Sequence, residues 1–125
     1  MFKPKILIVE DEFLIAMDLK TKLIRAGYPV CGPVATGKDA IESTRKEAPG
    51  VVLMDIRLMG EMDGIEAARQ IGSFSSAIII FTTGYQMVDL KARAMELKPA
   101  AYLNKPVLAR DIDAVIQSAS KNAAS

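Results

Sequence analysis

The sequence contains no histidine in its 125 residues. Without histidine, the chain cannot form a Ser-His-Asp or Cys-His catalytic group, a histidine-ligated zinc site or an imidazole acid–base catalyst. Any reaction that passes through a histidine must take that residue from a partner protein. The composition therefore excludes a large group of hydrolases and zinc enzymes.

Cysteine, net charge and long apolar runs are also scarce. The single cysteine, Cys31, cannot form an internal disulfide, which is typical of a reducing cytoplasm. The formal net charge is +1, which gives no indication of a surface for nucleic acid or lipid. No apolar run approaches the roughly 20 residues that span a bilayer, and residues 1–4 lack the features of a signal peptide. We expect a cytoplasmic protein with no membrane segment and no direct contact to nucleic acid.

Short β-type runs alternate with helical periodicity along the whole chain. The predicted strands cover residues 5–9, 29–35, 51–54, 77–81 and 100–103. The predicted helices cover residues 12–26, 38–47, 65–71 and 87–97, and a last one begins near 108. This alternation predicts an α/β fold, a doubly wound parallel sheet with five helices on both faces. We expect one domain over residues 1–120 and a frayed tail over 121–125.

The first predicted helix has an apolar face at helical spacing. Its members are Ile15, Ala16, Leu19, Leu23 and Ala26. Residues three and four apart share one side of a helix, so this face is expected to pack on the sheet.

Polar residues follow four of the predicted strands, at the point where each strand ends. They are Glu10-Asp11-Glu12, Asp55, Thr82-Thr83-Gly84 and Asn104-Lys105-Pro106. In open parallel sheets, ligands bind outside the carboxyl ends of the strands, so these groups are expected to meet. Carboxylates suit Mg²⁺, and a hydroxyl and an ammonium suit phosphoryl oxygens. The pattern predicts a site that binds a divalent metal and handles a phosphoryl group.

With these residues placed, the chain resembles the receiver domain of two-component response regulators, from Lys5 to about Ser118. Four segments carry the resemblance: residues 6–12 (ILIVEDE), 52–58 (VLMDIRL), 81–85 (FTTGY) and 101–106 (AYLNKP). The resemblance implies a flavodoxin-like fold with five parallel strands in the order 2-1-3-4-5.

The resemblance also implies a role for each site residue. Asp55 matches the phosphoacceptor, and Lys105 matches the lysine that contacts the phosphoryl group. Asp11 matches the carboxylate that binds Mg²⁺ directly, and Glu10 its neighbour, which often acts through water. Two further groups complete the set: the backbone carbonyl of Arg57 as a metal ligand, and Thr83 with Tyr102 as the switch pair.

The function implied is phosphorylation-dependent signalling rather than enzymatic turnover. A histidine kinase or histidine phosphotransfer protein would donate to Asp55, and residues 86–118 would form the output surface for a downstream protein. Lys91, Arg93, Asp111 and Asp113 could form a phosphorylation-dependent homodimer face, or only a solvated surface.

Three positions depart from the commonest family pattern. Met59 stands where proline is common, which would make the loop after the acceptor more mobile. Asp63-Gly64 falls one residue later than usual, and Val107 stands where phenylalanine is frequent. The string at 81–85 is similar to an F-x-T-G-Y subgroup of receivers.

Other interpretations of the sequence stay open or fail on particular residues. A phosphorylation-independent adaptor on the same fold would not need the acidic residues, Thr83 and Lys105 together. An FMN carrier would need a hydroxyl-rich phosphate loop after the first strand, and a haloacid-dehalogenase phosphatase would need an Asp-x-Asp motif. Residues 32–39 mimic a nucleotide-binding P-loop but end in Asp39 instead of a hydroxyl. Tyr102 could also be static core packing, and the sequence names neither the kinase nor the output partner.

Overall fold

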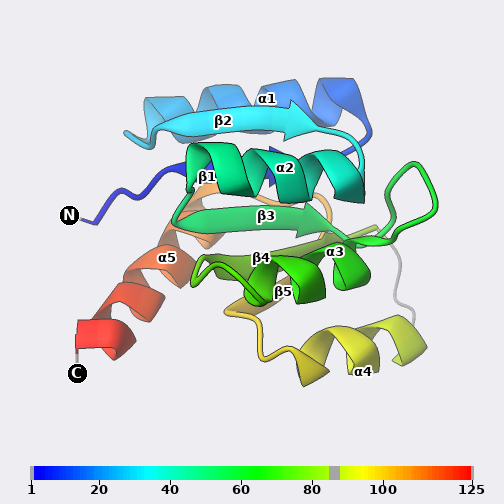
Figure 1. Ribbon diagram of the computed structural model, residues 1–125. Coiled ribbons are helices and arrows are strands. Elements are labelled where there is room, and N and C mark those ends of the chain that lie inside the picture. The colour runs from blue at the N-terminus through cyan, green and yellow to red at the C-terminus, as the bar shows by residue number, and fades with distance from the viewer. Residues whose placement is uncertain (1, 85–87, 125) are drawn as a thin grey trace.

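The computed structural model describes residues 2–84 and 88–124, in which strands and helices alternate along the chain (Figure 1). The strands are β1 (Ile6–Val9), β2 (Val30–Val34), β3 (Val51–Asp55), β4 (Ile78–Thr83) and β5 (Ala101–Asn104). The helices are α1 (Phe13–Arg25), α2 (Gly37–Glu47), α3 (Gly64–Gly72), α4 (Val88–Glu96) and α5 (Ala109–Ala124). All neighbouring strands pair in parallel, in the order β2-β1-β3-β4-β5. The predicted doubly wound sheet and its strand order are confirmed.

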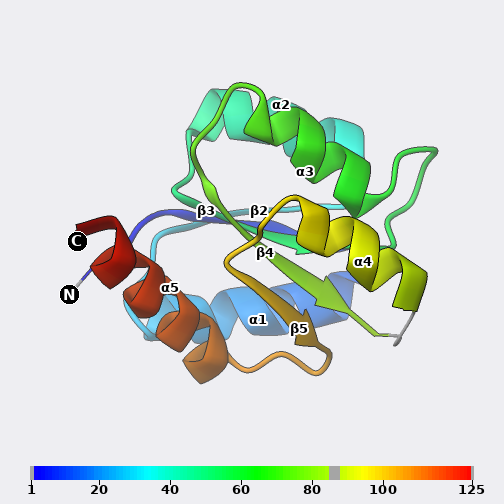
Figure 2. The same ribbon diagram turned by 90° about the horizontal axis from the view of Figure 1, so that it is seen from below.

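The sheet separates two apolar cores (Figure 2). One face packs against α2, α3 and α4 through residues such as Ala40, Ile71 and Ala94. The other face packs against α1 and α5 through residues such as Leu23 and Ile116. Successive side chains along a strand point to opposite faces of the sheet, and both faces of the central strands are buried in apolar cores. Successive positions of these strands are therefore apolar, which explains their unbroken apolar runs.

Several element ends differ from the sequence prediction. Strand β4 continues to Thr83, two residues beyond the predicted end, because its partner β3 also extends, to Asp55. Helix α5 extends through Ala124, and alanines 119, 123 and 124 favour helix; the fraying expected over residues 121–125 stays a prediction. The predicted helix over 87–97 is observed as Val88–Glu96, and Met87 lies outside the described residues.

The P-loop mimic at residues 32–39 is not a phosphate cradle. Gly32, Pro33 and Val34 belong to the edge strand β2. Thr36 then caps α2, because its hydroxyl accepts a hydrogen bond from the backbone N–H of Asp39 at 3.1 Å. An extended strand followed by a capped helix agrees with the rejection of nucleotide binding.

A polar cluster ties α5 to the amino-terminal edge of the sheet. The hydroxyl of Tyr28, whose ring is buried, donates a hydrogen bond to the Asp113 carboxylate. The Lys3 ammonium lies 4.4 Å from the centre of that ring and 3.5 Å from Asp113 Oδ1. The Gln117 amide donates to Tyr28 Oη at 3.2 Å and to the carbonyl oxygen of Phe2 at 2.6 Å. These contacts lie at the end of the sheet opposite the polar strand ends.

Among the described residues, no helix is both long and apolar enough to cross a membrane.

Candidate functional site

The predicted acidic residues converge at the carboxyl edge of the two central strands. Glu10, Asp11 and Asp55 each bring one carboxylate oxygen within 4.8 Å of the others. The pairing of Val9 with Met54 explains this, because the next residue on each strand reaches the same level at the sheet edge. Glu10 and Asp55 are buried, with 7% and 3% of their surface exposed. The site thus concentrates negative charge where water is largely excluded.

Lys105 supplies the opposite charge from the loop after β5. Its Nζ atom lies 2.6 Å from Glu10 Oε1 and 2.9 Å from Asp55 Oδ2. The loop is held at the end of β4, because the Lys105 backbone N–H donates to the carbonyl oxygen of Thr83 at 2.7 Å. Burial alone would lower the pKa of Lys105, but its hydrogen bonds to the two carboxylates and their charges raise it. Lys105 is therefore held as a cation.

Asp11 lies at the solvent side of the same cluster. Burial, its hydrogen bond with Glu10 and the charge of Glu10 raise the pKa of the Asp11 carboxyl. A hard divalent cation favours ionised oxygen ligands and would offset the repulsion between the Glu10 and Asp11 carboxylates. The donor set therefore fits Mg²⁺, with Glu10, Asp11 and Asp55 as the side chains able to hold it.

The turn after Asp55 is fixed by backbone contacts. The N–H of Arg57 donates to Asp55 Oδ1 at 3.2 Å, and the N–H of Ile56 donates to the carbonyl oxygen of Thr82 at 3.1 Å. The N–H of Gly64 donates to the carbonyl oxygen of Ile56 at 2.8 Å and so closes the loop. A Cβ atom on Gly64 would lie 2.0 Å from the Asp55 carbonyl oxygen, so only glycine fits there.

The loop after Asp55 also contacts the start of α2. Met59 forms an isolated parallel bridge with Thr36. A Cβ atom on Gly37 would lie 2.9 Å from the sulfur of Met62, so the side chain of Met62 packs directly on this glycine. The backbone at Met59 and the side chain of Met62 thus connect this loop, which lacks the common proline, to the start of α2.

Thr83 and Tyr102 come from neighbouring strands. Phe81 pairs with Tyr102 and Thr83 with Asn104, so the two residues of the predicted switch pair are close in register. Thr83 is two residues after Phe81, and alternation places it on the same face as Phe81 and Tyr102, the face that α4 covers. The Tyr102 hydroxyl is buried and has no hydrogen-bond partner among the residues that the structure describes. Tyr85, the last residue of the 81–85 motif, lies outside those residues.

A groove of about 580 Å³ opens beside the acidic cluster. Leu14 and Ile15 of α1 form one wall, Val107 and Leu108 form the other, and Glu10 and Lys105 also line it. Leu14 is 83% exposed and Ile15 43%, so the prediction that Ile15 faces the core is wrong. Ala26 is exposed as well, and Ala16 and Leu23 are the buried members of that predicted face. Leu14 is an apolar residue outside the predicted inward face of α1, and this was the missed sequence signal for the groove.

Comparisons with known proteins agree with this geometry. The family model described as the response regulator receiver domain matches residues 6–117. The chain is 38% identical over 115 residues to the transcriptional regulatory protein PdtaR of Mycobacterium tuberculosis, covering 92% of this chain and 56% of the relative. It is 34% identical over 116 residues to the phyllosphere-induced regulator PhyR of Methylorubrum extorquens, covering 92% and 43%. The chain spans about half the length of these relatives.

Solved structures give the same result. The signal receiver domain of a modulated diguanylate cyclase from Desulfovibrio desulfuricans G20 is 36% identical, with a TM-score of 0.87 and coverage of 94% of this chain and 93% of that one. A CheY-like receiver domain protein from Methanospirillum hungatei is 27% identical, with a TM-score of 0.86 and coverage of 97% and 96%. With the sheet order, the acidic cluster and the strand-end lysine in place, the chain belongs to the response regulator receiver domain family.

Proposed function

We propose that this chain is a signalling phosphoacceptor that receives a phosphoryl group on Asp55 with the help of Mg²⁺. The observation that carries the proposal is the environment of Asp55. Its buried carboxylate lies beside Glu10 and Asp11 and within 2.9 Å of the Lys105 ammonium. This arrangement offers a nucleophile, a place for a metal and a fixed cation within one small volume.

The transfer itself needs little covalent chemistry from the protein. A carboxylate oxygen of Asp55 attacks the phosphorus of a partner's phosphohistidine, the new P–O bond forms and the P–N bond breaks. The bonding pair goes to the imidazole nitrogen of the donor, which remains on the partner. Mg²⁺, held by the three carboxylates and the Arg57 carbonyl, would neutralise charge on the phosphoryl oxygens. Lys105 contributes a second cation, and its ammonium turns from the carboxylates to the phosphoryl oxygens.

The groove between α1 and the loop after β5 suits the phosphodonor. Its apolar walls, Leu14, Ile15 and Leu108, are exposed and lie beside the acidic cluster. A helix with an apolar stripe would fill the groove and bring a side chain next to Asp55. The proposed donor is a histidine kinase or a histidine phosphotransfer protein, which supplies the imidazole that this chain lacks.

Modification of Asp55 would then change a binding surface. In the proposed switch, Thr83 turns toward the new phosphoryl oxygens and Tyr102 moves into the space that Thr83 leaves. The buried hydroxyl of Tyr102, which has no partner among the described residues, favours such a move, because an unpaired buried donor costs free energy. The surface formed by α4, β5 and α5 would bind a downstream protein or a second copy of the chain, in the cytoplasm.

The test is the thermal midpoint with Mg²⁺ and then with Mg²⁺ plus beryllofluoride, which mimics a phosphoryl group on Asp55. Ligand at about ten times its Kd adds about 1.4 kcal/mol, which is a shift of a few degrees for a domain of this size. We expect a rise with Mg²⁺ and a further rise with beryllofluoride. Asp55→Asn should lose the second rise, whereas Asp111→Asn, which changes an exposed carboxylate on α5, should keep both.

Labelling with a small phosphodonor gives an independent measure. Wild type should acquire acid-labile phosphate and Asp55→Asn should not. A folded wild-type protein that responds to none of these reagents would contradict the proposal. It would favour the phosphorylation-independent adaptor.

A further inference from the structure

Asp63 makes two contacts that point to different elements. Its Oδ1 atom accepts a hydrogen bond from the Glu66 N–H at 2.8 Å and caps the start of α3. Its Oδ2 atom lies 3.3 Å from Nη1 of Arg93, which belongs to α4. Each oxygen has its own partner, so the cap and the ion pair do not compete. One carboxylate thus joins α3 and α4.

The same residue is tied to the phosphoacceptor through the backbone. Gly64 follows Asp63, donates to the carbonyl oxygen of Ile56 and packs against the Asp55 carbonyl oxygen with no room for a Cβ atom. A displacement of Asp63 therefore displaces the turn that contains Asp55. Gly64 and Asp63 thus connect the Asp55–Ile56 turn to Arg93.

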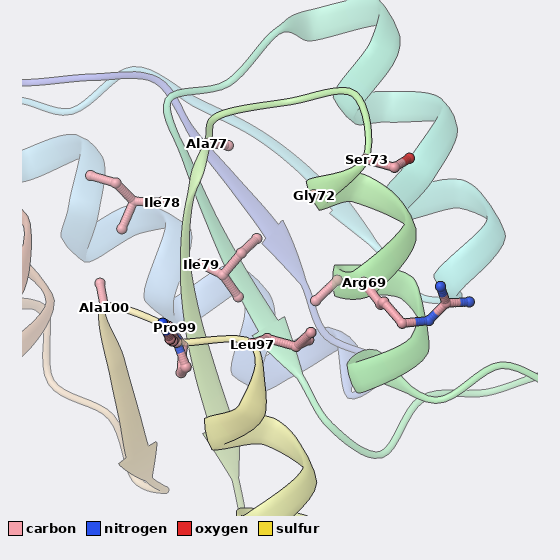
Figure 3. A pocket seen from close by; sticks show the side chains of 11 residues that line it. Arg69, Gly72, Ser73, Ala77, Ile78, Ile79, Leu97, Pro99 and Ala100 are labelled. Carbon is pink, nitrogen blue, oxygen red and sulfur yellow. The ribbon is translucent and has the colours of Figure 1, made fainter.

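A hollow lies just beyond the carboxyl end of α4, whose last turn contains Arg93. It has a volume of about 550 Å³ and lies between the second half of α3 and the segment 97–100 that joins α4 to β5 (Figure 3). Ala68, Ile79 and Leu97 give it apolar walls. The hollow separates the second half of α3 from the segment that leaves α4, whereas the ion pair joins the cap of α3 to the last turn of α4. The segment that follows α4 therefore has space beside it, and the Asp63–Arg93 pair opposes a shift of the helix toward that space.

Among the described side chains, α4 packs on the sheet through one small buried residue and two partly buried leucines at its edge. Ala94 is fully buried, and Leu90 and Leu97 pack against the core at its edge. A small central residue with two half-buried leucines permits sliding more readily than large interlocked side chains do. A directional contact such as an ion pair then has a larger share in setting where the helix lies.

We propose that the Asp63–Arg93 ion pair is a latch that holds α4 against the loop after Asp55 in the unmodified state and opens when Asp55 is modified. This inference rests on the proposed function, because it concerns the switch that phosphorylation would operate. Asp63 and Arg93 are positioning residues, since they act on the acidic cluster only through the backbone of the loop and do not supply a group to it. Breaking the latch removes stabilisation from the unmodified state alone, so affinity for Mg²⁺–beryllofluoride should rise by about 1.5- to 5-fold, the range for exposed ion pairs.

The experiment is a beryllofluoride titration of four variants in saturating Mg²⁺. Asp63→Asn keeps an oxygen for the α3 cap but loses the charge, and Arg93→Gln removes the other partner. Each should raise the affinity by the same factor, and the double variant should raise it no further, because both changes break one interaction. Arg93→Lys keeps the charge and should stay near wild type.

Arg69→Gln is the matched control. Arg69 pairs with Glu66 within α3, with Nη2 to Oε1 at 2.9 Å, and the pair does not reach α4. Its removal should leave the beryllofluoride affinity unchanged. Equal effects of Arg69→Gln and Arg93→Gln, or additive effects of Asp63→Asn and Arg93→Gln, would overturn the latch.

Hydrogen exchange of the α4 backbone amides, measured without beryllofluoride, separates the two proposals. Asp63→Asn and Arg93→Gln should each speed exchange in α4, and Arg69→Gln should not. If wild type binds no beryllofluoride, the proposed function fails, but the exchange rates still decide whether the latch exists. Unchanged α4 exchange in both variants would disprove the latch even if wild type binds beryllofluoride normally.

Discussion

The Lys105 ammonium is shared between two buried carboxylates, with Glu10 Oε1 at 2.6 Å and Asp55 Oδ2 at 2.9 Å. These carboxylates end adjacent strands, β1 and β3, and the lysine reaches them from beyond β5. The same carboxylates belong to the acidic cluster that fits Mg²⁺. A metal bound there would therefore share this set of carboxylates with the ammonium.

Lys105→Met should destabilise the protein and strengthen its response to Mg²⁺. The change leaves two buried carboxylates without their cation, which costs about 3 kcal/mol when one partner of a buried pair is removed. Mg²⁺ would then no longer share the carboxylates with an ammonium. We expect half-maximal stabilisation at about tenfold lower Mg²⁺, equivalent to about 1.4 kcal/mol, measured by urea unfolding across a Mg²⁺ series.

Lys22→Met is the matched control for Lys105→Met. It breaks an exposed pair in α1, in which Lys22 Nζ lies 2.8 Å from Asp18 Oδ2. An exposed pair contributes at most about 1 kcal/mol, so stability should change little and the Mg²⁺ response not at all. Equal Mg²⁺ midpoints for wild type and Lys105→Met would show that the lysine and the metal do not share these carboxylates.

Gly64→Ala should damage fold and site together. The added Cβ atom would lie 2.0 Å from the Asp55 carbonyl oxygen, so the backbone of α3 or of the acceptor turn has to move. Forced overpacking of this kind costs about 3 kcal/mol. We expect a lower urea midpoint and, in the folded fraction, weaker binding of Mg²⁺ and beryllofluoride.

Gly72→Ala serves as the comparison on the same helix. No atom lies within 4 Å of a Cβ placed there, and Gly72 is the last residue of α3. Alanine favours helix over glycine by about 0.5–1 kcal/mol, so this variant should be as stable as wild type or more stable. Similar losses in both variants would mean that the contact with Asp55 is not the cause.

Tyr28→Phe should remove a pH dependence of stability at alkaline pH. Burial and the hydrogen bond to Asp113 raise the pKa of Tyr28 to about 12, above its ordinary value of 10.0. The folded state keeps this proton more tightly than the unfolded state does. The stabilisation is therefore complete below about pH 10 and is lost as the pH rises through about 12, on the order of 2–3 kcal/mol in all.

Urea unfolding of both proteins from about pH 9 to about pH 12 measures the difference. At the lower pH, wild type should have the larger free energy of unfolding, because phenylalanine cannot donate a hydrogen bond to Asp113. This difference in stability should vanish at the higher pH. The two proteins differ only at residue 28, so the difference between their curves reports on that side chain and its contacts. Parallel curves over this range would rule out a raised pKa for Tyr28.

The position of the site could be predicted because it depends on strand order and on residues next to strand ends. Glu10, Asp55 and Lys105 each follow a short apolar run, and a parallel sheet brings such ends to one edge. The resemblance to a family then assigned each residue a role. The structure confirms that these three residues meet.

The sequence did not predict contacts that depend on the packing of helices. Asp63 and Arg93 are 30 residues apart, and only the position of α4 beside the loop brings their charges together. Leu14 lies outside the inward face of α1, so periodicity alone gave it no role. Ile15 sits at the border of that face, where a small rotation of the helix decides between core and groove.

The Tyr28–Asp113 cluster at the amino-terminal edge of the sheet shares no residue with the acidic cluster at the carboxyl edge. Substitutions in the former change how firmly α5 is anchored, while Glu10, Asp11, Asp55 and Lys105 stay as they are. A lineage carrying this domain could therefore adapt its heat tolerance at one end of the sheet without altering the acidic cluster at the other. The separation gives the fold two nearly independent targets for selection.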